Sequence, residues 1–221
     1  MIPTTQAGDT KIALQYLVRE PKIKSEHPPV LFLLHGIGSN EEDLFSFADR
    51  LPGKFLVISV RAPIHLGGNS FAWYEMNFST GKPVFNFQQE EVSRAALIKF
   101  IQQIKEKYSA DGSEIYLCGF SQGAIMSYSI GLTRPDLIRG MAIMSGRLLE
   151  EIKPLIASKE KLKTLKIFIS HGTNDSTLPV QYARDANAYL KSLNINASYR
   201  EYTDGHTING EMLADLVNWL K

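Results

Sequence analysis

The fold is decided by the stretch EIYLCGFSQGAIMSYSIGL, residues 114–132, in which two periodicities meet. The apolar run before Gly119 is typical of a strand buried on both faces, and the residues after Ser121 follow a helical pattern. Ser121 therefore lies at a strand-to-helix turn, with Gly119 and Gly123 on either side. Glycines at these two positions allow strand and helix to approach closely. The stretch predicts a tight turn that presents the Ser121 hydroxyl.

Apolar runs and amphipathic stretches alternate along the whole chain. Strands are predicted at residues 12–18, 29–35, 54–60, 114–120, 140–145, 165–170 and 197–202. Helices are predicted at residues 41–51, 88–108, 122–132, 179–193 and 208–221. The second helix has a predicted apolar stripe of Val92, Ala95, Ala96, Ile98, Phe100, Ile101 and Ile104. This alternation favours an α/β fold, a mostly parallel sheet with helices on both faces, and we expect one domain over residues 1–221.

The composition is that of a globular protein and argues against several function classes. Hydrophobic residues make up 44% and charged residues 21% of the chain, and the formal net charge is +1. Without a basic block, we expect no electrostatic binding to nucleic acid or to an anionic membrane. We also expect no membrane span, no secretory signal, no metal and no cofactor. The only cysteine, Cys118, is predicted to be a small buried core residue, which fits a cytoplasmic location.

Reactive side chains gather where the apolar runs end, which is where parallel sheets bind ligands. A serine needs a base to take its proton and a third group to orient that base. Of the five histidines, His206 alone follows both Ser121 and a suitable acid, in the order serine, acid, histidine. The other four lie in turns or directly before a glycine at a strand end: His27, His35, His65 and His171. We therefore predict His206 as the base.

The acid and the oxyanion donors are predicted from the same strand ends. Asp175 follows the strand at 165–170 closely and is the preferred acid, with Asp204 as the alternative. The two oxyanion donors are predicted to be the backbone N–H groups of Gln122 and Ile37. A plain structural turn, or an anion site at the start of a helix, is the alternative reading of the serine turn.

Residues 61–88 form the longest stretch without clear periodicity, and they are rich in aromatic side chains. These are Phe71, Trp73, Tyr74, Phe78, Phe85 and Phe87. A loop of this length in a compact domain is usually functional, and aromatic residues can wall an acyl or aryl pocket. Trp73, in the middle of the segment, is predicted to be a substrate-binding residue. The alternative is that these side chains pack the loop onto the body.

Several short motifs together resemble the phospholipase/carboxylesterase family of α/β-hydrolases, which includes the acyl-protein thioesterases. They are LLHGIGSNEEDL, RAP, FAWYEM, GFSQGAIMSY, SGRL, HGTNDSTLPV and the closing GH, and they run from about residue 12 to the C-terminus. The resemblance implies an α/β-hydrolase fold, a triad of Ser121, Asp175 and His206, and an oxyanion hole at Ile37 and Gln122. No insertion is long enough for a separate cap domain, so we expect an open cleft.

The resemblance also implies an activity. Two local differences from the eukaryotic thioesterases restrict the expected substrates. Family members hydrolyse carboxylic esters and thioesters, including aryl esters, lysophospholipids and acylated proteins. This chain has WYEMNF where eukaryotic thioesterases have Trp-Phe-Asp, and Ser176-Thr177 where they have Pro-Val. We therefore expect a serine hydrolase of short-chain or aryl esters with a small-molecule substrate. A non-catalytic ligand-binding module and a serine peptidase are the alternatives, and the oligomeric state stays open.

Overall fold

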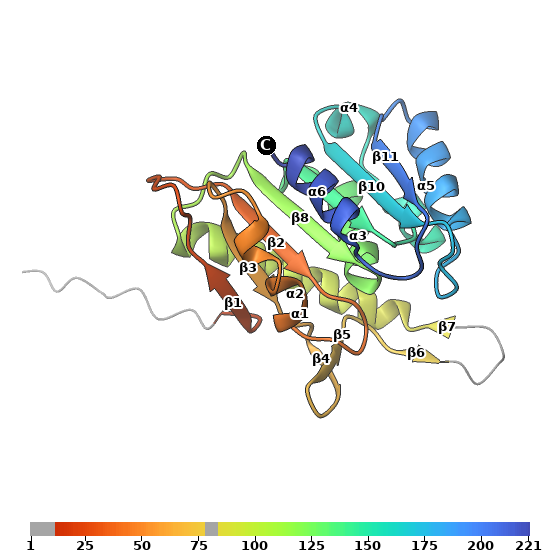
Figure 1. Cartoon of the computed structure of the whole chain (residues 1–221), viewed down its shortest axis with the longest axis horizontal. Coiled ribbons are helices and arrows are strands. Elements are labelled where there is room, and N and C mark those ends of the chain that lie inside the picture. Colours follow the sequence, from red (N-terminus) through yellow and green to blue (C-terminus); the bar gives the residue numbers. More distant parts are fainter. Residues whose placement is uncertain (1–11, 78–83) are drawn as a thin grey trace, which may run out of the picture.

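The computed structural model describes residues 12–77 and 84–221, and its centre is a seven-stranded sheet (Figure 1). The strands are β1 (Tyr16–Arg19), β2 (Val30–Leu34), β3 (Leu56–Val60), β8 (Ile115–Phe120), β9 (Gly140–Met144), β10 (Lys166–Gly172) and β11 (Ser198–Tyr202). Their order across the sheet is β1-β3-β2-β8-β9-β10-β11. β1 pairs antiparallel with β3, and all the other neighbours are parallel. The predicted α/β class with a mostly parallel sheet is thus confirmed.

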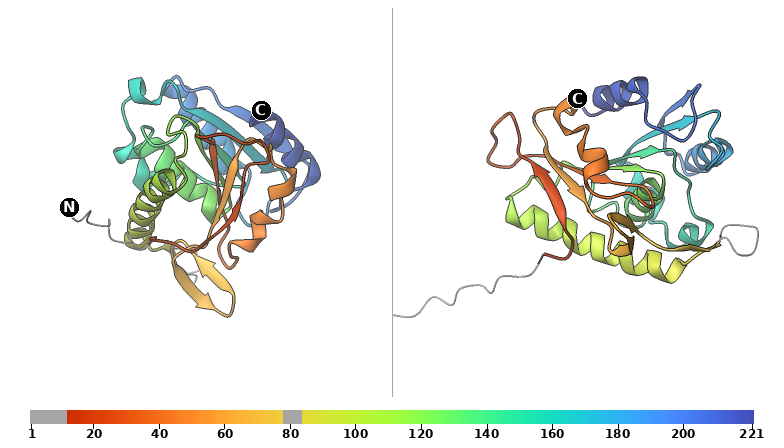
Figure 2. Two further views of the ribbon diagram at one scale, coloured as in Figure 1. Left: turned by 90° about the vertical axis from the view of Figure 1, so that its left-hand side faces the viewer. Right: turned by 60° about the horizontal axis from the view of Figure 1, so that its bottom comes forward.

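Helices cover both faces of this sheet (Figure 2). One face carries α2 (Phe87–Lys107), α3 (Gln122–Thr133), η2 (Glu150–Leu155), α4 (Lys159–Leu162) and α5 (Gln181–Ser192). The other face carries α1 (Glu42–Phe45), η1 (Ala48–Arg50) and α6 (Gly210–Trp219). The sheet therefore separates two apolar layers, as expected for a sheet that is buried on both sides.

The central strand β2 explains why a continuous apolar run is needed here. Val30, Phe32 and Leu34 point into the layer beneath α2 and α3. Leu31 and Leu33 point into the layer beneath α1 and α6. None of the five side chains is more than 2% exposed. Because successive side chains alternate between faces, a strand covered on both faces must be apolar at every position.

Helix α2 differs from the prediction in the face that it buries. Its amphipathic pattern placed Val92 in the apolar stripe, but Val92 is 66% exposed. Leu97 is fully buried instead, together with Phe100, Ile101 and Ile104. The side chains of Glu90 and Ser93 also face the core. Ser93 Oγ donates to the Trp73 carbonyl inside the core, a contact that a count of apolar residues does not detect.

The segment 61–88, predicted to be a loop, folds largely into two small hairpins. One joins β4 (Ile64–Gly67) to β5 (Ser70–Ala72), and the other joins β6 (Met76–Asn77) to β7 (Val84–Phe85). Phe78, one of the aromatic residues singled out in this segment, lies outside the described residues. The predicted helix at 41–51 is also broken, into α1 and η1.

The strand order reverses between β2 and β8. The neighbours of β2 are β3 on one side and β8 on the other. After β2, the chain first adds β3 to one side of that strand and later adds β8 to the opposite side. Loops that leave two such strands diverge, and they leave a crevice at the carboxyl edge of the sheet. The arrowheads of β2, β8, β10 and β11 point to that same edge (Figure 1).

Candidate active site

Ser121 occupies a strained turn between β8 and α3. Its backbone has φ 54° and ψ −117°, a conformation that a residue with a side chain rarely adopts. The turn is tight because Gly119 and Gly123 lie against neighbouring backbone. A Cβ on Gly119 would lie 2.2 Å from the Gly123 oxygen, and one on Gly123 would lie 2.0 Å from the Leu34 oxygen. The two glycines around the serine are therefore required by the close approach of α3 to β2 and β8.

His206 connects Ser121 to Asp175, and all three residues follow different strands. The His206 Nε2 atom lies 2.9 Å from the Ser121 Oγ, and its Nδ1 atom lies 2.6 Å from Asp175 Oδ2. The Asp175 side chain is fully buried, whereas 18% of the His206 side chain is exposed. The structure thus brings together the three side chains that the sequence predicted, in the order in which a base bridges a hydroxyl and an acid.

The Asp175 carboxylate is oriented by its own loop. Its Oδ1 atom accepts hydrogen bonds from the N–H groups of Thr177 at 2.9 Å and Leu178 at 2.8 Å. This leaves Oδ2 free to face His206. The alternative acid, Asp204, is turned away: its carboxylate accepts from the Gly205 N–H and from the Asn209 side chain. Asp204 shapes the turn before His206 and does not contact that imidazole.

His171 supports the Asp175 loop from behind. Its Nε2 atom donates to the Leu178 carbonyl at 2.7 Å and lies 3.3 Å from Asp175 Oδ2. The imidazole is fully buried at the end of β10. The sequence placed this histidine directly before a glycine at a strand end, and its contact with the carboxylate follows from the strand-end position that both residues share.

The two predicted oxyanion donors lie at the crevice between β2 and β8. Gln122 is the first residue of α3, so its N–H has no partner within the helix and lies at the positive end of the helix dipole. The loop after β2 is held by hydrogen bonds from the Gly38 N–H to Phe71 and from the Ser39 N–H to Gly36. Within the described part of the chain, no acceptor contacts the N–H of Ile37 or of Gln122.

Trp73 has a different environment from the predicted pocket wall. It is fully buried, so it offers no open surface to a ligand. Its indole N–H donates to the His35 carbonyl at 3.0 Å, and its backbone carbonyl accepts from Ser93 Oγ. The position of Trp73 in the middle of the segment did not predict its environment. The β4–β5 and β6–β7 strand pairs extend outward, and Trp73 lies between them against the core. Its contacts instead join the 61–88 segment to the loop after β2.

The Gln122 side chain is a functional contact that the sequence analysis missed. Its Oε1 atom accepts from the Trp73 N–H at 2.8 Å, and its Nε2 donates to the Tyr74 carbonyl at 2.7 Å. Gln122, Trp73 and Tyr74 are all buried. A glutamine amide has a donor and an acceptor at separate atoms of one side chain, so the glutamine after the serine in GFSQG was the available signal.

His35 completes the connection between these loops as a neutral imidazole. Its Nδ1–H donates to the Gly36 carbonyl at 2.7 Å, and its Nε2 accepts from the Ala62 N–H at 3.1 Å. One nitrogen donates and the other accepts, which only the neutral ring can do. Burial lowers the pKa of His35 below its ordinary value, in agreement with that tautomer. Cys118 is likewise buried in β8, and burial raises the pKa of its thiol to about 12, as expected for a structural cysteine.

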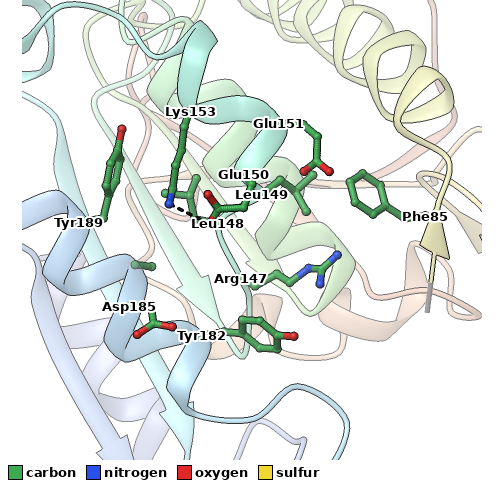
Figure 3. A pocket seen from close by; sticks show the side chains of 11 residues that line it. Phe85, Arg147, Leu148, Leu149, Glu150, Glu151, Lys153, Tyr182, Asp185 and Tyr189 are labelled. Atoms are coloured by element: carbon green, nitrogen blue, oxygen red, sulfur yellow. Dashed lines mark hydrogen bonds and ion pairs between the residues drawn. The ribbon is translucent and has the colours of Figure 1, made fainter. Parts of the chain in front are cut away.

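A cavity of about 440 Å³ opens beside these loops (Figure 3). Its walls come from β7, from the segment after β9 and from α5. They are formed by Phe85, Arg147, Leu148, Leu149, Glu150, Glu151, Lys153, Tyr182, Asp185, Ala186 and Tyr189. Of the predicted aromatic segment, Phe85 reaches this cavity, and the sequence analysis did not single out Arg147.

Residues 12–77 and 84–221 contain neither a cluster of metal-ligating side chains nor a membrane-spanning helix. No group of three or more His, Cys, Asp or Glu side chains is placed there to hold a metal ion. None of the helices in the same ranges combines the length and apolarity that crossing a membrane requires.

Curated proteins similar to this chain are esterases and thioesterases by name. A probable carboxylesterase of Arabidopsis thaliana, SOBER1-like, is 29% identical over 157 residues, which cover 68% of this chain and 58% of the relative. The match thus spans little more than half the length of that plant protein. Acyl-protein thioesterase 1 of Mycosarcoma maydis is 27% identical over 203 residues, covering 81% of this chain and 82% of the relative.

Solved structures share the fold, and a family model matches nearly the whole chain. The Bacillus cereus carboxylesterase superposes with a TM-score of 0.81 at 22% identity, over 94% of this chain and 93% of that one. A carboxylesterase from Mesorhizobium loti also has a TM-score of 0.81, at 22% identity and 96% coverage of both chains. The model of the phospholipase/carboxylesterase family matches residues 17–221. With its α/β-hydrolase sheet and its Ser121 turn at the crevice, the chain belongs to the phospholipase/carboxylesterase family.

Proposed function

We propose that the protein is a serine hydrolase that cleaves carboxylic esters through an acyl-enzyme on Ser121. The observation that carries this proposal is the position of His206, with Ser121 Oγ at 2.9 Å from one ring nitrogen and Asp175 Oδ2 at 2.6 Å from the other. A serine hydroxyl becomes an activated nucleophile when it contacts a neutral imidazole that in turn contacts a buried carboxylate.

In the first half of the reaction, Ser121 Oγ attacks the ester carbonyl carbon and His206 Nε2 takes the hydroxyl proton. The Nδ1–H of the ring donates to Asp175, so the positive imidazolium is stabilised by a full negative charge. The carbonyl π electrons move onto oxygen, which becomes an oxyanion. When the tetrahedral intermediate collapses, the bond to the alcohol oxygen breaks, and His206 gives its proton to that leaving oxygen.

The oxyanion is assigned to the N–H groups of Ile37 and Gln122. Both donors are backbone groups without a protein acceptor in the described residues, and the Gln122 donor lies at the start of α3. Fixed donors of this kind need no reorganisation when charge develops on the oxygen, and each contributes roughly 3–4 kcal/mol to the barrier reduction.

The second half of the reaction repeats these steps with water. His206 takes a proton from a water molecule, whose oxygen attacks the acyl carbon. The intermediate then collapses with cleavage of the bond to Ser121 Oγ, which recovers its proton from His206. The acid product leaves, and the free enzyme is regenerated.

The substrates are proposed to be short-chain or aryl esters, with thioesters and lysophospholipids as further classes to test. The chain holds only the short helices η2 and α4 between β9 and β10, so the edge of the sheet beside Ser121 is not covered by an inserted cap there. A cytoplasmic location stays a prediction of the sequence.

A fluorophosphonate probe tests the proposal, because only an activated serine attacks such a reagent. We expect one label per chain, found on Ser121 by peptide mass spectrometry, and no label on Ser121→Ala. Ser145 is a suitable internal control, since it also has a positive φ of 50° at a strand end but has no histidine bound to its hydroxyl. Labelling at Ser145, or none in folded protein, contradicts the proposed function.

A non-catalytic binding module is the second candidate. One relative, from Oryza sativa subsp. japonica and 21% identical over 202 residues, carries the name probable inactive carboxylesterase. The two candidates differ in turnover, because a binding module retains an ester intact. Release of 4-nitrophenol from 4-nitrophenyl butyrate that disappears in Ser121→Ala supports the enzyme, and ester binding without turnover supports the module.

A further inference from the structure

The cavity between β7, the segment after β9 and α5 has a cation held between two aromatic rings. The Arg147 guanidinium lies 5.4 Å from the ring centre of Phe85 and 5.6 Å from that of Tyr182. Figure 3 shows the Arg147 side chain extending toward these two rings and away from the Glu150–Lys153 pair. Aromatic faces on both sides restrict the guanidinium and leave its N–H groups available along its edge.

Of the five charged side chains that line the cavity, two form an ion pair with each other and three have no partner of opposite charge among the described residues. Lys153 binds Glu150 at 2.8 Å, and Asp185 accepts a hydrogen bond from Gln181. In the described part of the chain, no carboxylate lies within ion-pair distance of Arg147, and none of the basic groups lies within that distance of Glu151. One unpaired cation, Arg147, therefore faces the cavity, and two carboxylates without a cationic partner in that part of the chain, Glu151 and Asp185, lie on the same lining.

Arg147 is connected to the candidate nucleophile by short paths. The Ser121 N–H donates to the carbonyl of Met144, the last residue of β9, and the chain reaches Arg147 three positions later. On the other side, the Tyr74 carbonyl accepts from the Gln122 side chain, and the Tyr74 ring lies 5.5 Å from that of Phe85. Burial raises the pKa of the Tyr74 hydroxyl, and the Arg147 charge opposes this rise.

We propose that this cavity binds a carboxylate group of the ester substrate, with Arg147 as the binding residue. The proposal rests on the proposed esterase function and specifies its substrate class: esters that carry a carboxylate in addition to the scissile bond. A guanidinium edge matches a carboxylate with two parallel hydrogen bonds. A monoanion fits better than a phosphate dianion, because the cavity offers one unpaired cation and the carboxylates of Glu151 and Asp185 repel further negative charge.

The carboxylate can belong to the acyl half or to the alcohol half of the ester, and two matched pairs of substrates distinguish these sources. For the acyl half, 4-nitrophenyl hemiadipate is compared with 4-nitrophenyl hexanoate, which has the same chain length. For the alcohol half, 4-acetoxybenzoate is compared with phenyl acetate. In each pair the measured quantity is the ratio of kcat/KM for the anionic ester to kcat/KM for the neutral ester.

Three variants test the charge pattern. Arg147→Met is expected to lower the ratio roughly tenfold in one of the two pairs, the scale of a partly exposed charge pair. Glu151→Gln is expected to raise the same ratio, because it removes one repelling carboxylate. Lys153→Met is the matched control: it also removes a cation from the lining, but that cation is already paired with Glu150 and is expected to leave the ratio within about twofold.

The outcomes separate this inference from the proposed function. If neutral esters are hydrolysed but Arg147→Met leaves both ratios within about twofold, the carboxylate site is wrong and the esterase stands. If no ester is hydrolysed, the esterase is wrong, and calorimetry of 4-nitrophenyl hemiadipate and hexanoate binding to Ser121→Ala still tests the site. There, and in the same measurement with 4-acetoxybenzoate and phenyl acetate, preferential binding of the anionic ester that Arg147→Met removes supports the inference, and equal binding within both pairs overturns it.

Discussion

Two regions meet at Ser121, and they use their polar groups in different ways. In the strand-end loops, side chains bind side chains: the Ser121 hydroxyl, the His206 ring and the Asp175 carboxylate contact one another directly. At Trp73 and Tyr74 of the 61–88 segment, the contacts run to the backbone. The Trp73 indole binds a carbonyl, and the Gln122 amide binds the backbone of Trp73 and Tyr74.

The side-chain contacts can take part in proton transfer, whereas the backbone contacts can only hold a loop in position. Groups that exchange protons must face each other as side chains, since only these change their protonation state during a reaction. A backbone contact carries no such chemistry, but it holds a loop at a defined place. We infer that the 61–88 segment maintains the geometry on which the Ser121 loop depends. The predictions below test this division, beginning with the largest expected effect.

Replacing Ser121 by alanine should reduce kcat on 4-nitrophenyl butyrate by roughly 10⁴–10⁶. The variant removes the attacking oxygen, and no other group in the strand-end loops can take its place. Steady-state assays of 4-nitrophenol release, at protein concentrations determined by absorbance, measure the effect. His206→Gln should cause a loss of similar size without a further loss in the double variant, because the two residues act as one unit.

Asp175→Asn should reduce kcat by about 10⁴, because the amide presents a donor to His206 Nδ1 and favours the wrong tautomer. Asp204→Asn is the matched control two residues before His206. Its carboxylate binds Gly205 and Asn209 and not the imidazole, so we expect an effect below about tenfold. If Asp204→Asn were the more damaging change, the assignment of the acid would be reversed.

Trp73→Phe tests the positioning region. The change removes the indole N–H and leaves the buried His35 carbonyl without that donor, which should cost about 1–3 kcal/mol in the free energy of unfolding. We also expect kcat to fall more than KM rises, because the shifted loop carries the Ile37 donor. Urea unfolding and steady-state kinetics measure both effects.

Tyr128→Phe is the control for that variant. Tyr128 is another fully buried aromatic residue of the same apolar layer, but its hydroxyl has no hydrogen-bond partner among the described residues. Its removal should leave the free energy of unfolding and kcat nearly unchanged or slightly improved. Equal losses in the Trp73 and Tyr128 variants would show that packing volume, and not the hydrogen bond, decides the effect.

The smallest expected effect concerns His35, which lies where the two regions join. Burial lowers the pKa of this imidazole, so the folded chain keeps it neutral while the unfolded chain protonates it near the ordinary value of about 6.5. Below that pH the unfolded state binds more protons, and the free energy of unfolding should therefore fall as the pH decreases. NMR titration of the His35 ring checks this directly, and a midpoint at or above 6.5 would contradict it.

The sequence alone determined the class of the fold and the three side chains at its edge. Continuous apolar runs such as β2 are needed wherever a strand is covered on both faces, and a serine between glycines is needed where α3 approaches β2. Chain order then separated His206 from the other histidines. These features are local, or depend only on the order of the strands, so the amino-acid sequence is enough to predict them.

The tertiary structure alone decided what surrounds those side chains. The sequence predicted Trp73 as a substrate-binding residue in a loop, but its side chain is buried, and Gln122, His35 and Ser93 contact this residue from three separate elements. Arg147 reads as one of many surface charges, but Phe85 and Tyr182 enclose it from distant parts of the chain. Contacts between residues far apart in sequence leave no periodicity, and their energies depend on burial, which only the folded chain defines.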